Sequence, residues 1–99
     1  MDNFTVTVVT GDIQRYSNDN DINLYPNPAQ NEITVGLENL KNGVPVEVAV
    51  YDLNGKRLDH KIGTGGGSLT IEVKHYVQGN YIIRAVQEQR AYSKQFLKE

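Results

Sequence analysis

The chain contains no cysteine among its 99 residues. Without a thiol it can form no disulfide bond, no thiolate metal site and no cysteine nucleophile. It also has no excess of basic residues, since its net charge is −2 and its pI is about 5.6. Nucleic-acid binding needs a basic surface that neutralises phosphates, so we expect no nucleic-acid partner.

Two other absences concern membranes and export. No apolar run approaches the roughly 20 residues that a membrane-spanning helix needs. The N-terminus lacks the basic segment followed by an apolar segment that marks a secretory signal peptide. Met1 is followed directly by the polar Asp2 and Asn3, and we expect the chain to be part of a longer protein.

The residues that are present describe a small globular protein. Hydrophobic residues make up 38% of the chain and charged residues 22%, a balance that separates it from disordered sequences. A chain of this length buries roughly 60–70% of its unfolded surface on folding, which is enough for one core. We therefore expect one domain.

Apolar and polar residues alternate along most of the chain, which is the period of a β-strand. No segment repeats its apolar residues with the helical period, so we expect almost no helix. Seven or eight short strands separated by turns predict an all-β fold, an antiparallel β-sandwich. The predicted strands lie near residues 4–10, 22–24, 32–37, 45–53, 56–62, 69–73, 80–86 and 90–98.

Several turns and loops follow from residue type. Asn54-Gly55 predicts a type I′ turn that joins two strands as a hairpin, with Asp52 assisting the turn. Residues 63–68, GTGGGS, predict a flexible loop, because they lack the Gly-Lys-Ser/Thr ending of a phosphate-binding loop. Residues 17–21, SNDND, are polar and turn-prone and predict a linker.

The segment Tyr25-Pro26-Asn27-Pro28 is stiff. Proline fixes φ and has no N–H, and it restricts the residue before it to extended geometry. Such a segment cannot lie inside a sheet ladder. We expect it to meet the sandwich at an edge and to direct the strand at 32–37.

No group of side chains forms a catalytic or metal-binding constellation. His60 and His75 are far apart in sequence and each stands beside a lysine, and no serine lies in a nucleophile motif. Asp19 and Asp21 lack the glycine and glutamate spacing of a calcium loop. We therefore predict no enzyme activity, no cofactor and no metal site.

Two features remain open at this point. The tyrosines at 25, 51, 76, 81 and 92 could form a sugar-binding platform, although their spread over different strands favours the rim of the core. In the final stretch, RAYSKQFLKE, one face carries Arg90, Lys94 and Lys98 with two aromatic residues. This pattern fits an edge strand protected by lysines, and equally a strand with basic and apolar handles for a partner.

In order along the chain, five pieces form a recognisable pattern: LYPNPAQNEITV, VEVAVYDLNGKRL, SLTIEV, GNYIIRAV and a final SKQFLKE. With this pattern, residues 22–99 resemble the type A C-terminal sorting domain of the bacterial type IX, or Por, secretion system. The remaining residues 1–21 would hold an N-terminal strand and a linker, either a remnant of the cargo or the first strand of the domain.

The resemblance implies an Ig-like β-sandwich at the C-terminus of a cargo protein of Bacteroidota. Such domains direct cargo through the periplasm and across the outer membrane, to the cell surface or the medium. The partners it implies are the outer-membrane translocon, a shuttle β-barrel protein and a surface sortase that cuts the domain away. The alternative function is an adhesive or carbohydrate-binding module that uses the tyrosines.

The resemblance also selects the residues expected to serve in recognition. They are Tyr25, Pro26, Asn27, Pro28, Gly55, Lys56, Gly79, Tyr81, Lys94, Phe96, Leu97 and Lys98. The final strand is the part such machinery chiefly needs. If one of its edges is unpaired, it can add to a sheet of a partner through main-chain hydrogen bonds, or form a strand-exchanged homodimer.

Overall fold

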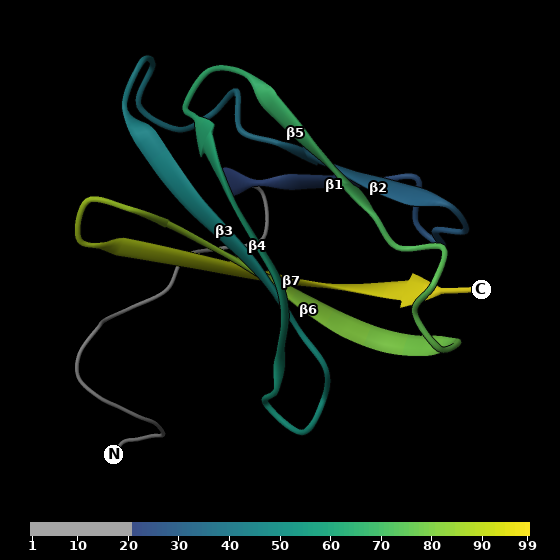
Figure 1. The fold of residues 1–99 in the computed structure, drawn as a ribbon. Coiled ribbons are helices and arrows are strands. Elements are labelled where there is room, and N and C mark those ends of the chain that lie inside the picture. Colours follow the sequence, from purple (N-terminus) through teal and green to yellow (C-terminus); the bar gives the residue numbers. More distant parts are fainter. Residues whose placement is uncertain (1–20) are drawn as a thin grey trace.

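The computed structural model describes residues 21–99, which are drawn in colour in Figure 1. The predicted strand at 4–10 and most of the predicted linker at 17–21 lie outside the described residues. The described part contains seven strands and no α-helix. They are β1 (Asn23–Tyr25), β2 (Glu32–Gly36), β3 (Pro45–Tyr51), β4 (Arg57–Thr64), β5 (Ser68–Glu72), β6 (Gly79–Gln87) and β7 (Arg90–Lys98).

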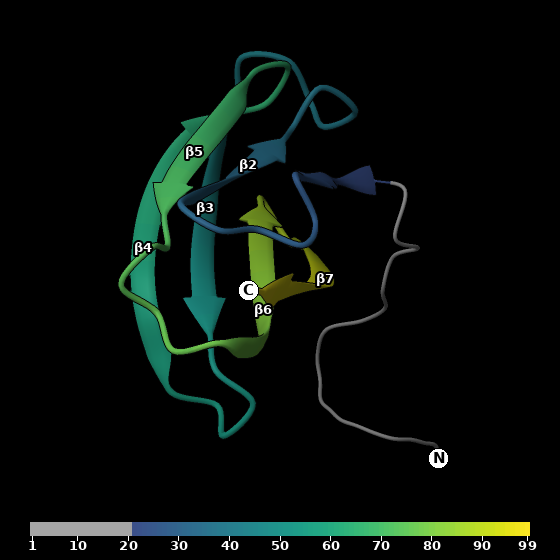
Figure 2. The ribbon, with the colours of Figure 1, turned by 90° about the vertical axis from the view of Figure 1, so that its right-hand side faces the viewer.

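The strands form two antiparallel sheets that pack face to face. One sheet has the order β1-β2-β5 and the other the order β4-β3-β6-β7. Figure 2 shows β4 and β5 on one side of the sandwich and β1 and β7 on the other. The predicted all-β sandwich is confirmed, and each of the seven strands predicted within the described residues is present.

The core lies between the sheets and is built from the alternate residues of each strand. Burying apolar surface in this layer stabilises the fold by about 25 cal/mol per Å² removed from water. The alternation places the valines of β3 in this layer and its Glu47 in solvent. The largest fully buried side chains are Ile22, Ile33, Val35, Leu37, Val46, Val48, Val50, Ile71, Val73, Ile83 and Phe96.

The glycine-rich segment between β4 and β5 is a tightly bonded turn, and the predicted flexible loop is wrong. Gly65 N–H donates to the carbonyl of Val44 at 2.9 Å, and Gly66 N–H donates to that of Leu37 at 2.8 Å. A Cβ on Gly65 would lie 1.8 Å from the carbonyl oxygen of Lys41. Glycine stands here because two backbones approach closely, which composition alone does not distinguish from flexibility.

The hairpin between β3 and β4 is confirmed, but its predicted turn type is wrong. Gly55 has a φ of 89°, whereas Asn54 does not adopt a positive φ, so the type I′ geometry is absent. A longer loop forms because the Asp52 carboxylate accepts the N–H groups of Asn54 and Lys56, both at 2.9 Å. The predicted role of Asp52 in the turn is therefore confirmed.

Gly65→Ala tests the close approach of the two loops. We expect it to destabilise the domain by about 1–3 kcal/mol, because the added methyl group overpacks the contact with Lys41. Gly67→Ala is the matched control, since a Cβ there meets only the oxygen of Thr64 at 3.5 Å. Urea unfolding measures both changes, and equal midpoints would contradict the proposed role of Gly65.

Candidate functional site

The final strand, β7, lies at the edge of the four-stranded sheet. It pairs with β6 along its whole length, from Gly79 opposite Lys98 to Gln87 opposite Arg90. In Figure 1 it is the yellow ribbon that crosses the molecule and ends at the C-terminus. Among residues 21–99, β6 is the neighbour of β7 in the sheet order, so the second edge of β7 faces away from the sheet.

The two faces of β7 are divided as the alternation predicts, but the aromatic and basic face points inward. Phe96 is 1% exposed and Lys98 is 7% exposed, while Leu97 on the opposite face is 38% exposed. Lys94 is half-buried. These positions correct the expectation that Phe96 and Lys98 would be exposed handles. Every second side chain of an edge strand still packs into the core. Side chains that bind a partner would alternate with the same period of two, so the sequence pattern does not distinguish the two roles.

Phe96 is held by the Gly-x-Tyr motif on the neighbouring strand. Tyr81 lies directly opposite Phe96 in the sheet, and the two rings stack with centroids 5.7 Å apart. The Tyr81 hydroxyl donates a hydrogen bond to the carbonyl of Val77. Gly79 has a φ of 148°, a conformation that residues with a side chain rarely adopt. In this motif Tyr81 stacks its ring on Phe96, and Gly79 adopts the backbone conformation with which β6 begins.

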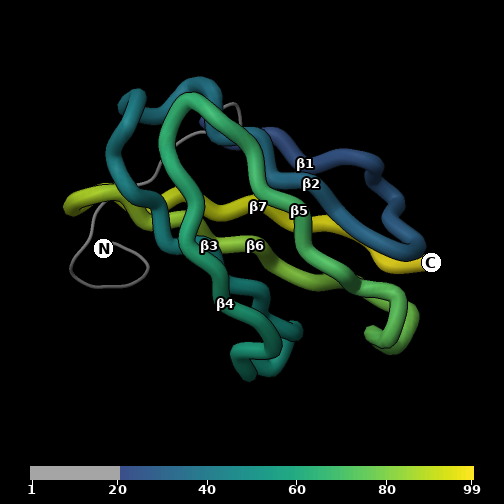
Figure 3. Tube along the Cα trace, turned by 45° about the horizontal axis from the view of Figure 1, so that its top comes forward, coloured from purple at the N-terminus to yellow at the C-terminus, as the bar shows by residue number. Residues whose placement is uncertain are grey.

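The end of β7 is clasped by residues 27–29, which lie between β1 and β2. Ala29 N–H donates to the carbonyl of Leu97 at 2.8 Å, and Glu99 N–H donates to the carbonyl of Ala29 at 2.8 Å. The side-chain oxygen of Asn27 accepts Leu97 N–H at 3.0 Å. We call these three hydrogen bonds the 27–29 clasp. Figure 3 shows this connection beside the yellow C-terminal end.

Through the clasp, the proline-rich segment lies against the end of β7. Pro26 and Pro28 carry no N–H, and both peptide bonds that precede them are cis. The expected contact with a sheet edge is confirmed, and the edge belongs to β7 in the opposite sheet. Residues about 70 positions apart in sequence are therefore neighbours, since Leu97 and Asn27 bond directly.

Residues 23–99 match the family model of the secretion system C-terminal sorting domain. The chain belongs to this family, the C-terminal sorting domains of type IX secretion. The match spans all seven strands and both segments that the 27–29 clasp joins. A comparison with curated proteins returned no match.

The fold of the sorting domain brings together half of the twelve residues predicted to serve in recognition. Those that meet around the end of β7 are Asn27, Gly79, Tyr81, Phe96, Leu97 and Lys98, joined by Ala29. Tyr25 closes β1 and is 48% exposed. Gly55 and Lys56 lie away from this group, in the hairpin loop between β3 and β4. In the sheet, β3 and β6 separate β4 from β7.

Two residues that the sequence did not single out also position the tail of the sorting domain. Ala29 is fully buried and carries two of the three clasp bonds. Gln87 is 4% exposed; its side-chain oxygen accepts the Lys41 N–H at 3.0 Å, and its side-chain N–H donates to the Lys41 carbonyl at 2.9 Å. These bonds anchor the hairpin that starts β7. Neither residue carries a sequence signal, because their roles depend on partners that lie 46 to 70 positions away in the sequence.

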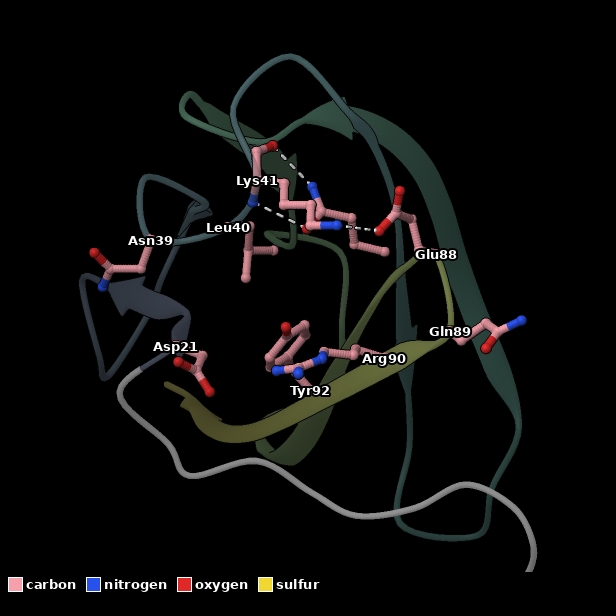
Figure 4. A pocket seen from close by; sticks show the side chains of 9 residues that line it. Asp21, Asn39, Leu40, Lys41, Glu88, Gln89, Arg90 and Tyr92 are labelled. Carbon is pink, nitrogen blue, oxygen red and sulfur yellow. Dashed lines mark hydrogen bonds and ion pairs between the residues drawn. The ribbon is translucent and has the colours of Figure 1, made fainter.

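A hollow of about 840 Å³ lies beside the start of β7 (Figure 4). Its rim carries charges of both signs, and Lys41 and Glu88 neutralise each other at 2.8 Å. Among the described residues, no group of three His, Cys, Asp or Glu side chains could hold a metal ion. No helix of the described part is long and apolar enough to cross a membrane.

The tyrosines of the sorting domain do not share one platform. Tyr76 donates a 2.5 Å hydrogen bond to Asp59 and tilts against Tyr81 at 5.0 Å. Burial raises the pKa of Tyr76, and the bonded carboxylate of Asp59 raises it further. Tyr92 lies on β7 at 8% exposure, while Tyr25 is half-exposed on β1. The rim prediction is therefore correct only in part: Tyr81 and Tyr92 belong to the buried core, and Tyr76 packs against it.

Phe96→Ala tests whether the tail completes the core. We expect a loss of about 3–5 kcal/mol in the free energy of unfolding, because a fully buried aromatic ring is removed. Leu97→Ala, one residue on and facing outward, should cost at most about 0.5–1 kcal/mol. Urea titration followed by circular dichroism gives both values. Similar losses for the two variants would contradict the inward assignment of Phe96.

Asn27→Ala tests the side-chain bond of the clasp. We expect the Leu97 amide to exchange its hydrogen faster and the domain to lose about 0.5–1.5 kcal/mol, because this N–H loses its acceptor. Asn31→Ala in the same connection is the control, since the Asn31 side chain is exposed and only its backbone carbonyl is bonded, to Val73. Unchanged exchange at Leu97 in Asn27→Ala would contradict the clasp.

Proposed function

We propose that the outer-membrane translocon and its shuttle β-barrel recognise the folded domain through β7 and the 27–29 clasp. The domain then acts as an address and not as an enzyme. The coarser role follows from the family, since a sorting domain of type IX secretion directs its cargo to the cell surface or the medium. One observation supports recognition through β7 and the clasp: residues 27–29, near the start of the family pattern, bond directly to residues 97–99 at its end.

A clasped tail suits recognition better than a loose one. Binding an unfolded peptide costs roughly 1–2 kcal/mol of backbone entropy for each residue that becomes ordered. In the sorting domain Phe96 is buried and Leu97 is bonded on both its N–H and its carbonyl before any partner arrives. The machinery would therefore meet a preformed strand, and an unfolded cargo tail would not offer the same surface.

We further propose that a surface sortase separates cargo from the domain on the N-terminal side of Ile22. Ile22 is 1% exposed and belongs to the core, so a cut beyond it would remove part of the sandwich. The polar segment 17–21 is the nearest sequence that suits a protease. The cargo would pass through the periplasm before this step, and the released piece would retain all seven described strands.

A reporter fused in front of the full chain tests the proposed function. In a cell with an active type IX system, we expect the reporter at the cell surface or in the medium. Removing residues 90–99 should leave it in the periplasm, as should placing the whole chain in front of the reporter. The second arrangement keeps the sandwich intact, so it separates loss of the address from loss of folding. Undiminished export in both arrangements would contradict the proposal.

A further inference from the structure

We propose that the outer edge of β7, from Ala91 to Gln95, accepts one extended strand of the type IX machinery through main-chain hydrogen bonds. This inference rests on the proposed function and specifies the surface that the machinery would contact. We call residues 91–95 the edge window.

The clasp shows which backbone groups of β7 point away from the sheet. Leu97 gives its N–H to Asn27 and its carbonyl accepts from Ala29, so both groups face away from β6. Backbone direction alternates with a period of two along an antiparallel strand. The N–H and carbonyl groups of Gln95 and Ser93, and then of Ala91, therefore face the same way as those of Leu97.

Within residues 21–99, no hydrogen bond engages these outward groups of the window. Ser93 and Gln95 are exposed, whereas Ala91 is 9% exposed and forms the margin. Ser93 and Gln95 together offer two donors and two acceptors. Strand addition uses such a row of groups, with the main chain supplying affinity and alternate side chains supplying selectivity.

Both ends of the window are closed, which sets the length of the occupant. The 27–29 clasp covers the backbone groups of Leu97 at one end. At the other end β7 turns back into β6 through Glu88 and Gln89, and Glu88 is tied to Lys41 at 2.8 Å. The open stretch is about five residues, or roughly 17 Å of strand. A short strand fits this space, and a long sheet edge does not.

The lysines of β7 leave the window uncovered. Lys98 Nζ donates to the backbone oxygen of Glu99 at 2.8 Å, and Lys94 Nζ lies 3.5 Å from the carbonyl of Ile22. The β5 edge differs, because Lys61 on β4 donates to the backbone carbonyl of Thr70 at 3.0 Å. Lysines at sheet edges commonly prevent unwanted strand addition. One lysine covers a carbonyl of β5, whereas the Nζ groups of Lys94 and Lys98 reach the backbone oxygens of Ile22 and Glu99, which lie outside the window.

Ser93→Pro tests the window without disturbing the β6–β7 ladder. Proline removes only the outward N–H of residue 93, and prolines are tolerated at such edge positions. In the reporter fusion with the full chain, we expect export to fall by about tenfold or more, since a main-chain bond and the fit of the added strand are lost together. Ser93→Ala keeps the N–H and should export like the parent. Normal export of a folded Ser93→Pro domain would overturn the inference.

The deletion of residues 90–99 distinguishes a failure of the proposed function from a failure of the edge window. If the deletion and the misplaced chain are both exported, the proposed function fails. If both are retained while Ser93→Pro is exported, only the edge window fails.

Hydrogen exchange of the full chain provides a measurement that does not depend on a variant folding. In the free chain at low concentration, the Ser93 and Gln95 amides should exchange fast, and adding purified translocon with its shuttle protein should protect them. No added protection would overturn the inference. Protection already present in the free chain would mean that another part of this chain covers the edge. Protection that grows with concentration would mean that a second copy covers it. Either result would overturn the inference.

Discussion

The burial of Phe96 is the constraint on which the C-terminal region depends. With Tyr81 stacked on it and the valines of β3 and β6's Ile83 in the same layer, this ring makes the last strand part of the core. A strand that contributes to the core cannot leave without exposing it. The tail is therefore held in one extended conformation, and its edge keeps a defined direction relative to the rest of the sandwich.

The clasp adds a second consequence. It joins a segment that follows β1 in one sheet to the end of β7 in the other, so the two sheets are tied at the side where β1 and β7 lie. Three hydrogen bonds at 2.8–3.0 Å close the last backbone groups of the tail. Within residues 21–99, the outward backbone groups that make no hydrogen bond lie nearer the start of the same strand. The tail thus combines a closed end that supports the fold with an open stretch that can meet a partner.

This arrangement joins two motifs of the family pattern that lie far apart in the sequence. The Tyr-Pro-Asn-Pro segment contributes the side chain of Asn27 to the tail, and the Gly-x-Tyr motif contributes the ring of Tyr81. Both motifs act on β7. Gly55 and Lys56 form a separate element, in which the Asp52 carboxylate organises a hairpin loop. In the structure these two residues lie in local turn geometry, with Gly55 at a φ of 89° and the Lys56 N–H bonded to Asp52.

Strand positions could be predicted from the sequence because the alternation of side chains is a local property, and β3 with its three valines is the clearest case. Turn details were less accessible. Asn54-Gly55 favours a two-residue turn, but the Asp52 carboxylate competes by binding two N–H groups and lengthens the loop. The glycines at 65–67 have the composition of a flexible linker, and their close packing depends on Lys41 and Leu37, which are distant in sequence.

The sequence by itself determined the strands of residues 21–99, the absence of thiols, and the resemblance to sorting domains, because all of these depend on residue type and spacing. Only the tertiary structure decided which face of β7 is buried, which strand edge meets Asn27 and Ala29, and where main-chain groups stay open. Alternation shows that two faces differ but does not say which one meets the opposite sheet. That choice is made by contacts between segments about 70 residues apart, such as Leu97 with Asn27.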